Sequence, residues 1–119
     1  MSQQVGERKR SPIDALVDVL AYFAAQKNYG YIDRIGNALD EMTIHEAIRD
    51  ALRDYHSLCV DRQQANCPNI DLGDVEKATN MIISELREKS GGEIVRVARQ
   101  IAVKALARKY RHMPKQETK

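Results

Sequence analysis

Apolar residues recur at intervals of three and four along most of this chain, and that spacing constrains the fold more than any other feature. Such intervals place apolar side chains on one face of an α-helix, whereas a half-buried strand would need strict alternation. The sequence shows no alternation over a useful length and no internal repeat. Each apolar face is too wide for a lone helix in water, so the helices must pack together. We therefore predict an all-α fold, a compact bundle of about five helices.

Capping residues, glycines and prolines predict where the helices begin and end. Ser11 suits a cap, and Pro12 suits the first helical position of the first helix. Asp14 stands three residues after that cap, as in a capping box. Asn28 and Gly30 favour a left-handed residue that would end this helix. Its inner face is expected to consist of Ile13, Leu16, Val17, Leu20, Phe23 and Ala24.

Two helices are expected in the next part of the chain. The second covers residues 31–42, although Gly36 weakens it. The third begins at Thr43, because Glu46 completes a second capping box. The inner residues are Ile32, Ile35, Leu39 and Met42 in the second helix, and Ile44, Ala47, Ile48, Ala51, Leu52, Tyr55, Leu58 and Cys59 in the third.

A break at Pro68 separates these helices from the last two. Proline does not fit a helix interior, and the residue before it disfavours the α region. The fourth helix is expected to begin at Asp71 and to end at the Ser-Gly-Gly of residues 90–92, and the fifth covers residues 93–111. The inner residues are Leu72, Val75, Thr79, Ile82 and Leu86 in the fourth helix, and Ile94, Val97, Ala98, Ile101 and Ala105 in the fifth.

The 119 residues fit one domain. Residues 1–10 lack apolar periodicity and are predicted to be a flexible arm, residues 11–112 a single helical domain, and residues 113–119 a polar tail. The N-terminus lacks the apolar region of a signal peptide, and no apolar stretch is long enough to span a bilayer. Two cysteines make no disulfide framework, so we expect a cytoplasmic protein without membrane contact.

Charge is distributed unevenly along the chain. Residues 1–11 have a net charge of +2. Residues 12–91 hold eight basic and fourteen acidic residues, a net charge of −6, whereas residues 92–119 hold eight basic and two acidic residues, a net charge of +6. An acidic body with basic ends can attract nucleic acid or an acidic partner surface.

The fifth helix carries most of the positive charge. On a helical wheel, Gln100 and a row of Arg and Lys lie opposite the inner face. Such a row can follow a phosphate backbone and release its counterions. The structural alternative is that these cations complement the helix dipole and keep the bundle hydrated. The candidate nucleic-acid-binding residues are Arg96, Arg99, Lys104, Arg108, Arg111 and Lys115.

The turn at residues 90–92 joins two helices, and a Gly-containing turn of this length is typical of a helix-turn-helix. Both expected helices are longer than that motif usually has, so a helical hairpin is the simpler interpretation. The run Ser-Gly-Gly-Glu-Ile at residues 90–94 resembles the Gly-Gly step in the Mor family of phage transcription activators. That family's following proline and complete C-terminal helix-turn-helix are absent, so no function is carried over.

Three residues have part of the spacing that a metal site requires. His56 and Cys59 stand three residues apart, and Cys67 follows in the break. Zinc usually needs a fourth ligand, which only the distant His45 or His112 would supply. A buried cysteine packs as a small apolar residue. No metal and no other cofactor is therefore expected.

Catalytic motifs are missing, since no Gly-rich phosphate loop, nucleophile elbow or metalloprotease helix is present. The carboxylates Glu46, Asp50 and Asp54 recur every four residues but alternate with arginines, which is typical of a solvated face with ion pairs. A small enzyme with an Arg-lined pocket for an anionic substrate is the third hypothesis for function. Its donors would be Lys27, Arg34, Arg49 and Arg53.

The first hypothesis is a non-catalytic regulatory or accessory protein that contacts nucleic acid or a nucleoprotein through its fifth helix. The second is a protein–protein adaptor or inhibitor that uses an acidic or Ala-rich helical face. The two differ in one observable, because binding to phosphates weakens steeply with salt and a dry apolar interface does not.

The fifth helix also predicts a homodimer. Val95, Val103 and Ala107 lie outside its inner stripe, and a second apolar strip often meets another chain. The core is also low in aromatic residues, at 5% of the chain. Sedimentation at micromolar concentration should therefore give the mass of a dimer. A monomer mass across a wide range of dilution would contradict the prediction.

Overall fold

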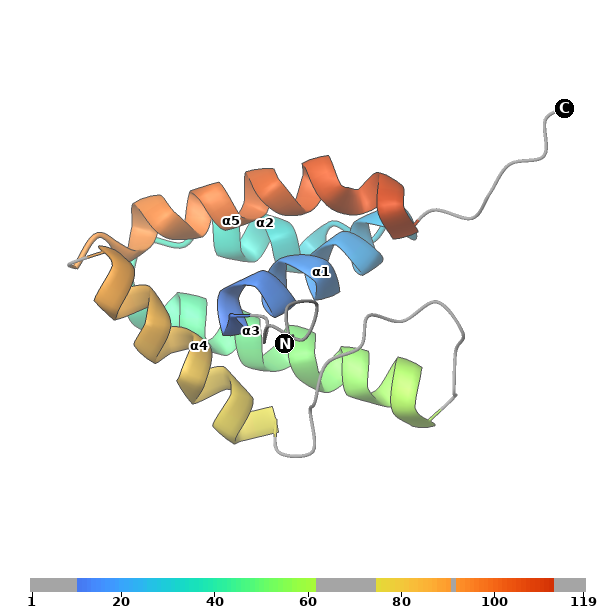
Figure 1. Cartoon of the computed structure of the whole chain (residues 1–119), viewed down its shortest axis with the longest axis horizontal. Coiled ribbons are helices and arrows are strands. Elements are labelled where there is room, and N and C mark those ends of the chain that lie inside the picture. Colours follow the sequence, from blue (N-terminus) through green and yellow to red (C-terminus); the bar gives the residue numbers. More distant parts are fainter. Residues whose placement is uncertain (1–10, 62–74, 91, 113–119) are drawn as a thin grey trace, which may run out of the picture.

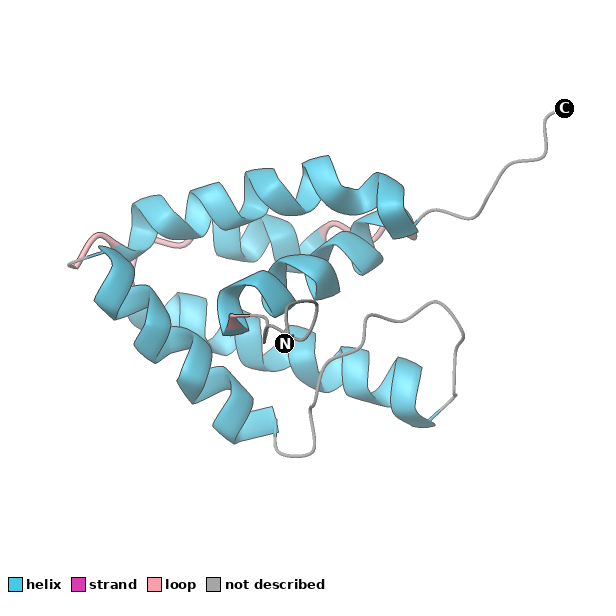
Figure 2. Ribbon diagram, in the orientation of Figure 1, coloured by secondary structure: helices cyan, strands magenta, loops and turns pink. Residues whose placement is uncertain are grey.

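Five α-helices and their connecting turns make up most of the described part of the chain, which comprises residues 11–61, 75–90 and 92–112 of a computed structural model (Figures 1 and 2). The helices are α1 (Pro12–Ala25), α2 (Gly30–Gly36), α3 (Glu41–Tyr55), α4 (Val75–Ser90) and α5 (Ile94–Arg108). A π-helical segment (His56–Asp61) continues α3, and a 3₁₀ turn (Lys109–His112) continues α5. No strand occurs in these ranges, and the predicted all-α fold is confirmed.

Several predicted features lie outside the described residues. They are the flexible arm, the break at Pro68, the start of the fourth helix at Asp71, and the polar tail with Lys115. The division into arm, helical domain and tail therefore stays a prediction. Among the described helices, none combines the length and the apolar character that crossing a membrane requires.

Helix α1 is surrounded by the other helices. Ser11 caps it as predicted, because the Ser11 hydroxyl accepts a hydrogen bond from the Asp14 amide at 3.1 Å. Every residue from 15 to 24 is buried, including the charged Asp18. The sequence predicted a single apolar face, but α1 is buried all round, as is typical of a helix at the centre of a bundle. In Figure 1 it lies between α5 and α3.

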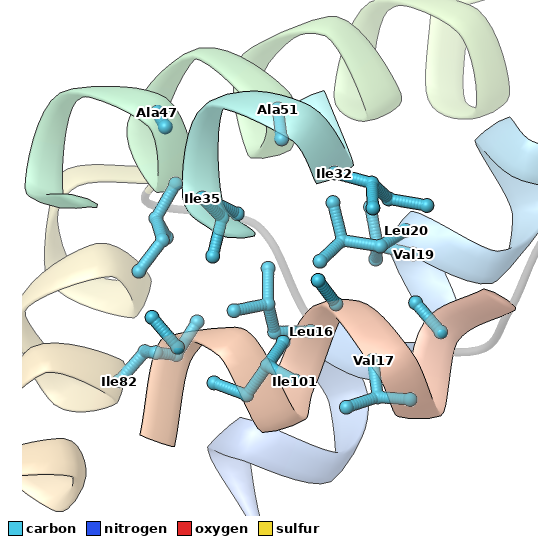
Figure 3. Packing of buried hydrophobic residues seen from close by; sticks show 14 of the residues in the cluster. Leu16, Val17, Val19, Leu20, Ile32, Ile35, Ala47, Ala51, Ile82 and Ile101 are labelled. Carbon is cyan, nitrogen blue, oxygen red and sulfur yellow. The ribbon is translucent and has the colours of Figure 1, made fainter. Parts of the chain in front are cut away.

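A single cluster of buried side chains joins all five helices. Figure 3 shows Leu16 of α1 among side chains that come from α2, α3, α4 and α5. Most of the cluster is aliphatic, and burying each Val, Leu or Ile side chain stabilises the fold by about 1.5–3 kcal/mol. The few aromatic residues meet at α1, where the rings of Tyr22 and Tyr55 pack edge to face with centroids 6.0 Å apart.

Small residues allow α2 to approach α5 closely. A Cβ atom placed on Gly36 would lie 3.1 Å from the Cβ of Ala102, which is tighter than ordinary van der Waals contact. Glycine weakens a helix through its backbone entropy. At the end of α2 that weakness is offset by the close packing that glycine permits.

The boundary between α2 and α3 differs from the prediction. Helix α2 ends at Gly36 instead of continuing to residue 42. Leu39 and Met42, which were expected in the core, are 77% and 72% exposed. Apolar spacing continued past the glycine in the sequence, but the chain turns there, so these two side chains leave the inner face.

The start of α3 is set by Asp40. Its side chain accepts a hydrogen bond from the Thr43 amide at 2.8 Å, and α3 therefore begins at Glu41. The predicted start at Thr43, with Glu46 as its box residue, is wrong. Aspartate is a stronger cap than threonine, so the earlier cap is the favoured one.

The left-handed residue after α1 is Lys27, with φ 65°, and the prediction of Asn28 or Gly30 is wrong. The Asn28 amide donates to the Phe23 carbonyl at 2.9 Å, and the Lys27 amide donates to the Ala24 carbonyl at 2.8 Å. These two hydrogen bonds form a Schellman motif, in which the residue before the last donor is left-handed.

Helices α4 and α5 meet near Gly92 and then diverge (Figure 1). The predicted hairpin would have packed them along their lengths. Instead, α1 separates them and contacts both. Its first turn is tied to α4, because the Ile13 amide donates to a Glu85 carboxylate oxygen at 3.1 Å. A carboxylate at this position also complements the positive end of the α1 dipole.

Tyr55 occupies a place in the core that makes its ionisation unfavourable. Its side chain is 2% exposed. Burial, together with the nearby Tyr22 and Asp18, raises the pKa of Tyr55 to about 12. An unfolded chain ionises tyrosine near its ordinary pKa of 10.0, two units lower.

This difference predicts a loss of stability at high pH. The contribution from Tyr55 is fully present below pH 10 and is lost as the pH rises towards 12, because only the unfolded chain gains the ionised phenol in this window. The total loss is about 2–3 kcal/mol of unfolding free energy. Urea unfolding of the Tyr55→Phe variant should show a flatter dependence on pH. The exposed Tyr110→Phe is the control, and an unchanged slope in Tyr55→Phe would contradict the assignment.

Candidate nucleic-acid interface

Helix α5 forms one long edge of the molecule (Figure 1). Its buried residues face α1 and α2, and its opposite side is exposed. Residues 94–112 contain six Lys or Arg residues and no acidic residue. The buried set is Ile94, Ala98, Ile101, Ala102 and Ala105. Four members of this set were predicted at the interior, and Ala102, which faces α2, was not.

Four of the candidate cations lie on the exposed side of α5, namely Arg96, Arg99, Lys104 and Arg111. Arg96 forms an exposed ion pair with Glu93, with 2.8 Å between Nε and the carboxylate. Such an exposed pair contributes little to stability and leaves the guanidinium accessible. Within the described part of the chain, no ion pair is seen for the other three. Lys115 lies outside that part.

A groove of about 780 Å³ runs between α5 and the first turns of α1. Its walls combine an apolar floor with a basic rim, so an anionic group would find cations on the α5 side. The floor includes Ile13, Val17, Val97 and Ile101, and the rim includes Arg96, Gln100, Lys104 and Arg111.

Arg108 differs from the other candidates because it is held by α1. Its Nη1 donates to Asp14 Oδ1 at 2.9 Å and to Asp18 Oδ1 at 3.4 Å. Its side chain is 22% exposed, and that of Asp18 is 5% exposed. Burial alone would lower the pKa of Arg108, but the hydrogen bond and the charges of the two carboxylates outweigh it and raise the pKa. Arg108 therefore attaches α5 to α1, a role that the sequence did not indicate.

Lys109 is also held by a residue from another part of the fold. Its ammonium donates to the Tyr29 hydroxyl at 3.2 Å and lies 5.3 Å from the centre of that ring. It also lies 5.5 Å from the centre of the Tyr110 ring. The contacts with Tyr29 hold the residue after α5 against the turn before α2.

The arginines proposed for an enzyme pocket are bound in ion pairs between helices. Arg34 pairs with Asp50 at 3.0 Å, while Arg49 and Arg53 lie 3.7 and 3.6 Å from Glu76. The face of α3 is thus an ion-paired surface, with partners from α2 and α4 rather than from α3 itself. Lys27 occupies the left-handed turn position after α1. Among the described cavities, none gathers these four residues.

Metal chemistry finds no support in the described residues, which contain no group of three or more His, Cys, Asp or Glu side chains able to hold an ion. Cys67 lies outside them. The trio of His56, Cys59 and Cys67 therefore extends beyond the described residues.

An exposed apolar strip on α5 was recognised only in part from the sequence. Val103 and Tyr110 are 65% and 69% exposed, and Leu106 is 39% exposed. Ala107 completes the strip, and Val95 is half-buried. The positions 103, 106, 107 and 110 follow helical spacing, which is the signal that would have revealed Leu106 and Tyr110.

Comparison of the chain with models of protein families, with curated proteins and with solved structures finds no match in any of the three.

The position of Arg108 predicts a marked loss of stability when its charge is removed. Arg108→Met removes the cation beside the buried Asp18 carboxylate, and the unfolding free energy should fall by about 2–4 kcal/mol. The exposed Arg99→Met is the matched control and should change it by roughly 0.5 kcal/mol or less. The double variant Asp18→Leu/Arg108→Met should recover much of the loss. Equal effects of the two single variants in urea unfolding would refute the assignment.

Proposed function

We propose that this protein is a non-catalytic regulatory or accessory factor that contacts nucleic acid, free or in a nucleoprotein, through the outward face of α5. One observation carries the proposal. All six charged residues between positions 94 and 112 are basic, and four of them are exposed along one edge of the molecule. Phosphates are the anions that such an extended row of cations fits best.

The acidic residues of the rest of the chain also favour binding of nucleic acid at α5. Glu41, Asp50 and Glu76 lie on α3 and α4, where they pair with arginines of α2, α3 and α4. These pairs neutralise one another, but residues 12–91 as a whole hold eight basic and fourteen acidic residues, and this net charge of −6 repels phosphates. Attraction at α5 and repulsion elsewhere would confine a nucleic acid to one edge.

The test is a titration of labelled oligonucleotides at several salt concentrations. Lys104→Ala and Arg111→Ala should each weaken binding by a similar factor for every sequence, because phosphate contacts position a protein without specifying bases. Each should also reduce the slope of log affinity against log salt by roughly one unit. Arg108 is unsuitable for this test, since its replacement also loosens α5.

Arg53→Ala provides the matched control, because it removes one exposed charge from α3, away from α5. It should leave the affinity and the salt slope nearly unchanged. The proposal fails if the intact protein does not bind at low salt, where the attraction is strongest. Binding that Lys104→Ala and Arg111→Ala leave intact would move the site away from α5.

A second candidate function is that of a protein–protein adaptor. It is favoured by the exposed strip of Val103, Leu106 and Tyr110, since large apolar side chains at helical spacing are typical of a surface that another protein covers. Binding through this strip would resist salt and would be lost in Tyr110→Ser. Binding to phosphates would show the opposite pattern.

A further inference from the structure

We infer that α5 is a recognition helix that enters the major groove of B-form duplex DNA, with Gln100 and Val103 against the base edges. This inference rests on the proposed function and adds to it the class of nucleic acid and the residues that determine sequence preference. It starts from the shape and the chemistry of the outward face of α5.

The shape of α5 suits the major groove. The helix has 15 residues, a length of about 22 Å, and it lies along an edge with no other described helix beyond it (Figure 1). An α-helix with side chains is about 10–12 Å across, close to the roughly 12 Å width of the major groove of B-form DNA. Helices α1 and α2 make most of its contacts, chiefly with the side that carries its buried residues.

Cations lie on both flanks of the face. Lys104 and Arg111 line the groove beside α1, whereas Arg99 does not. Arg99 and Lys104 are five residues apart, which places them about 140° apart around the helix. A helix that lies in the major groove has one phosphate strand on each side. These two flanks can therefore meet both strands.

Gln100 and Val103 lie between those flanks. Together with Arg96, Arg99 and Lys104 they border one shallow hollow of about 330 Å³ on the outer surface of α5. A glutamine amide can bind both N6 and N7 of adenine, and an apolar side chain can contact the thymine methyl group. Ala107, one turn after Val103, is small and exposed, so it lets the helix approach closely.

The hollow does not suit single strands or duplex RNA. None of its five bordering residues is aromatic, so it offers no platform on which unpaired bases would stack. The major groove of A-form RNA is too deep and narrow for a helix. Duplex DNA is therefore the favoured partner among nucleic acids with similar phosphate charge.

The first experiment compares three probes at one salt concentration: duplex DNA of roughly 20 base pairs, or two helical turns, with a randomised centre, the matching duplex RNA, and the single strand. Duplex DNA should bind at least roughly tenfold more tightly than the other two, because only it admits the helix. Selection from the randomised pool should enrich one adenine-containing site.

The second experiment tests whether Gln100 contacts the adenine base. At the selected adenine, 7-deazaadenine removes the N7 acceptor and leaves the Watson–Crick edge intact. It should weaken binding of the intact protein by roughly tenfold and should not weaken binding of Gln100→Ala further. Gln26→Ala, which alters an exposed glutamine after α1, is the control and should respond as the intact protein does.

Failure of this inference and failure of the proposed function would give different results. The inference that α5 is a recognition helix would be overturned by equal binding of the three probes, or by equal responses of Gln100→Ala and Gln26→Ala to 7-deazaadenine. Either result would leave phosphate binding by α5 intact. Absence of binding to all three probes at low salt would overturn the proposed function as well. Circular dichroism of each variant verifies that the helices remain folded.

Discussion

A carboxylate buried in the central helix is the constraint on which the rest of the structure depends. Asp18 lies in α1, where every residue from 15 to 24 is buried, and a buried charge is costly unless it is paired. One of its partners, Arg108, comes from the end of α5, ninety residues away in sequence. The end of α5 is thereby tied to α1, and the inner side of α5 is directed at the core.

The packing of α5 against α1 and α2 determines which of its side chains face outward. Gly36 and Ala102 allow α2 to pack closely against α5. The hydrogen bonds from Arg108 hold the far end of α5 to α1. With Ile94, Ala98, Ile101, Ala102 and Ala105 turned inward, the remaining side of α5 presents cations, Gln100 and Val103 to solvent. The same helix is thus anchored by one arginine while it offers others to a partner.

Local signals predicted some elements well and others poorly. Ser11 caps α1 as expected, since its hydroxyl meets an amide three residues away. The α2–α3 boundary was mistaken because apolar spacing continued beyond Gly36 and because the apparent capping box at Thr43 competes with Asp40, which is the stronger cap. Among the candidate cations, Arg96, Arg99, Lys104 and Arg111 are exposed as the helical wheel indicated. The contacts of Arg108 with Asp14 and Asp18 could not be predicted, because these partners are distant in sequence.

The sequence by itself determined that the chain is helical and where its positive charge lies, because periodicity and local composition are properties of neighbouring residues. Only the tertiary structure decided that α1 is enclosed on every side, that α4 and α5 diverge around it, and which cations of α5 remain exposed. Those features depend on contacts between residues far apart in the chain. Such contacts are set by how side chains fill the space between helices, which no local pattern encodes.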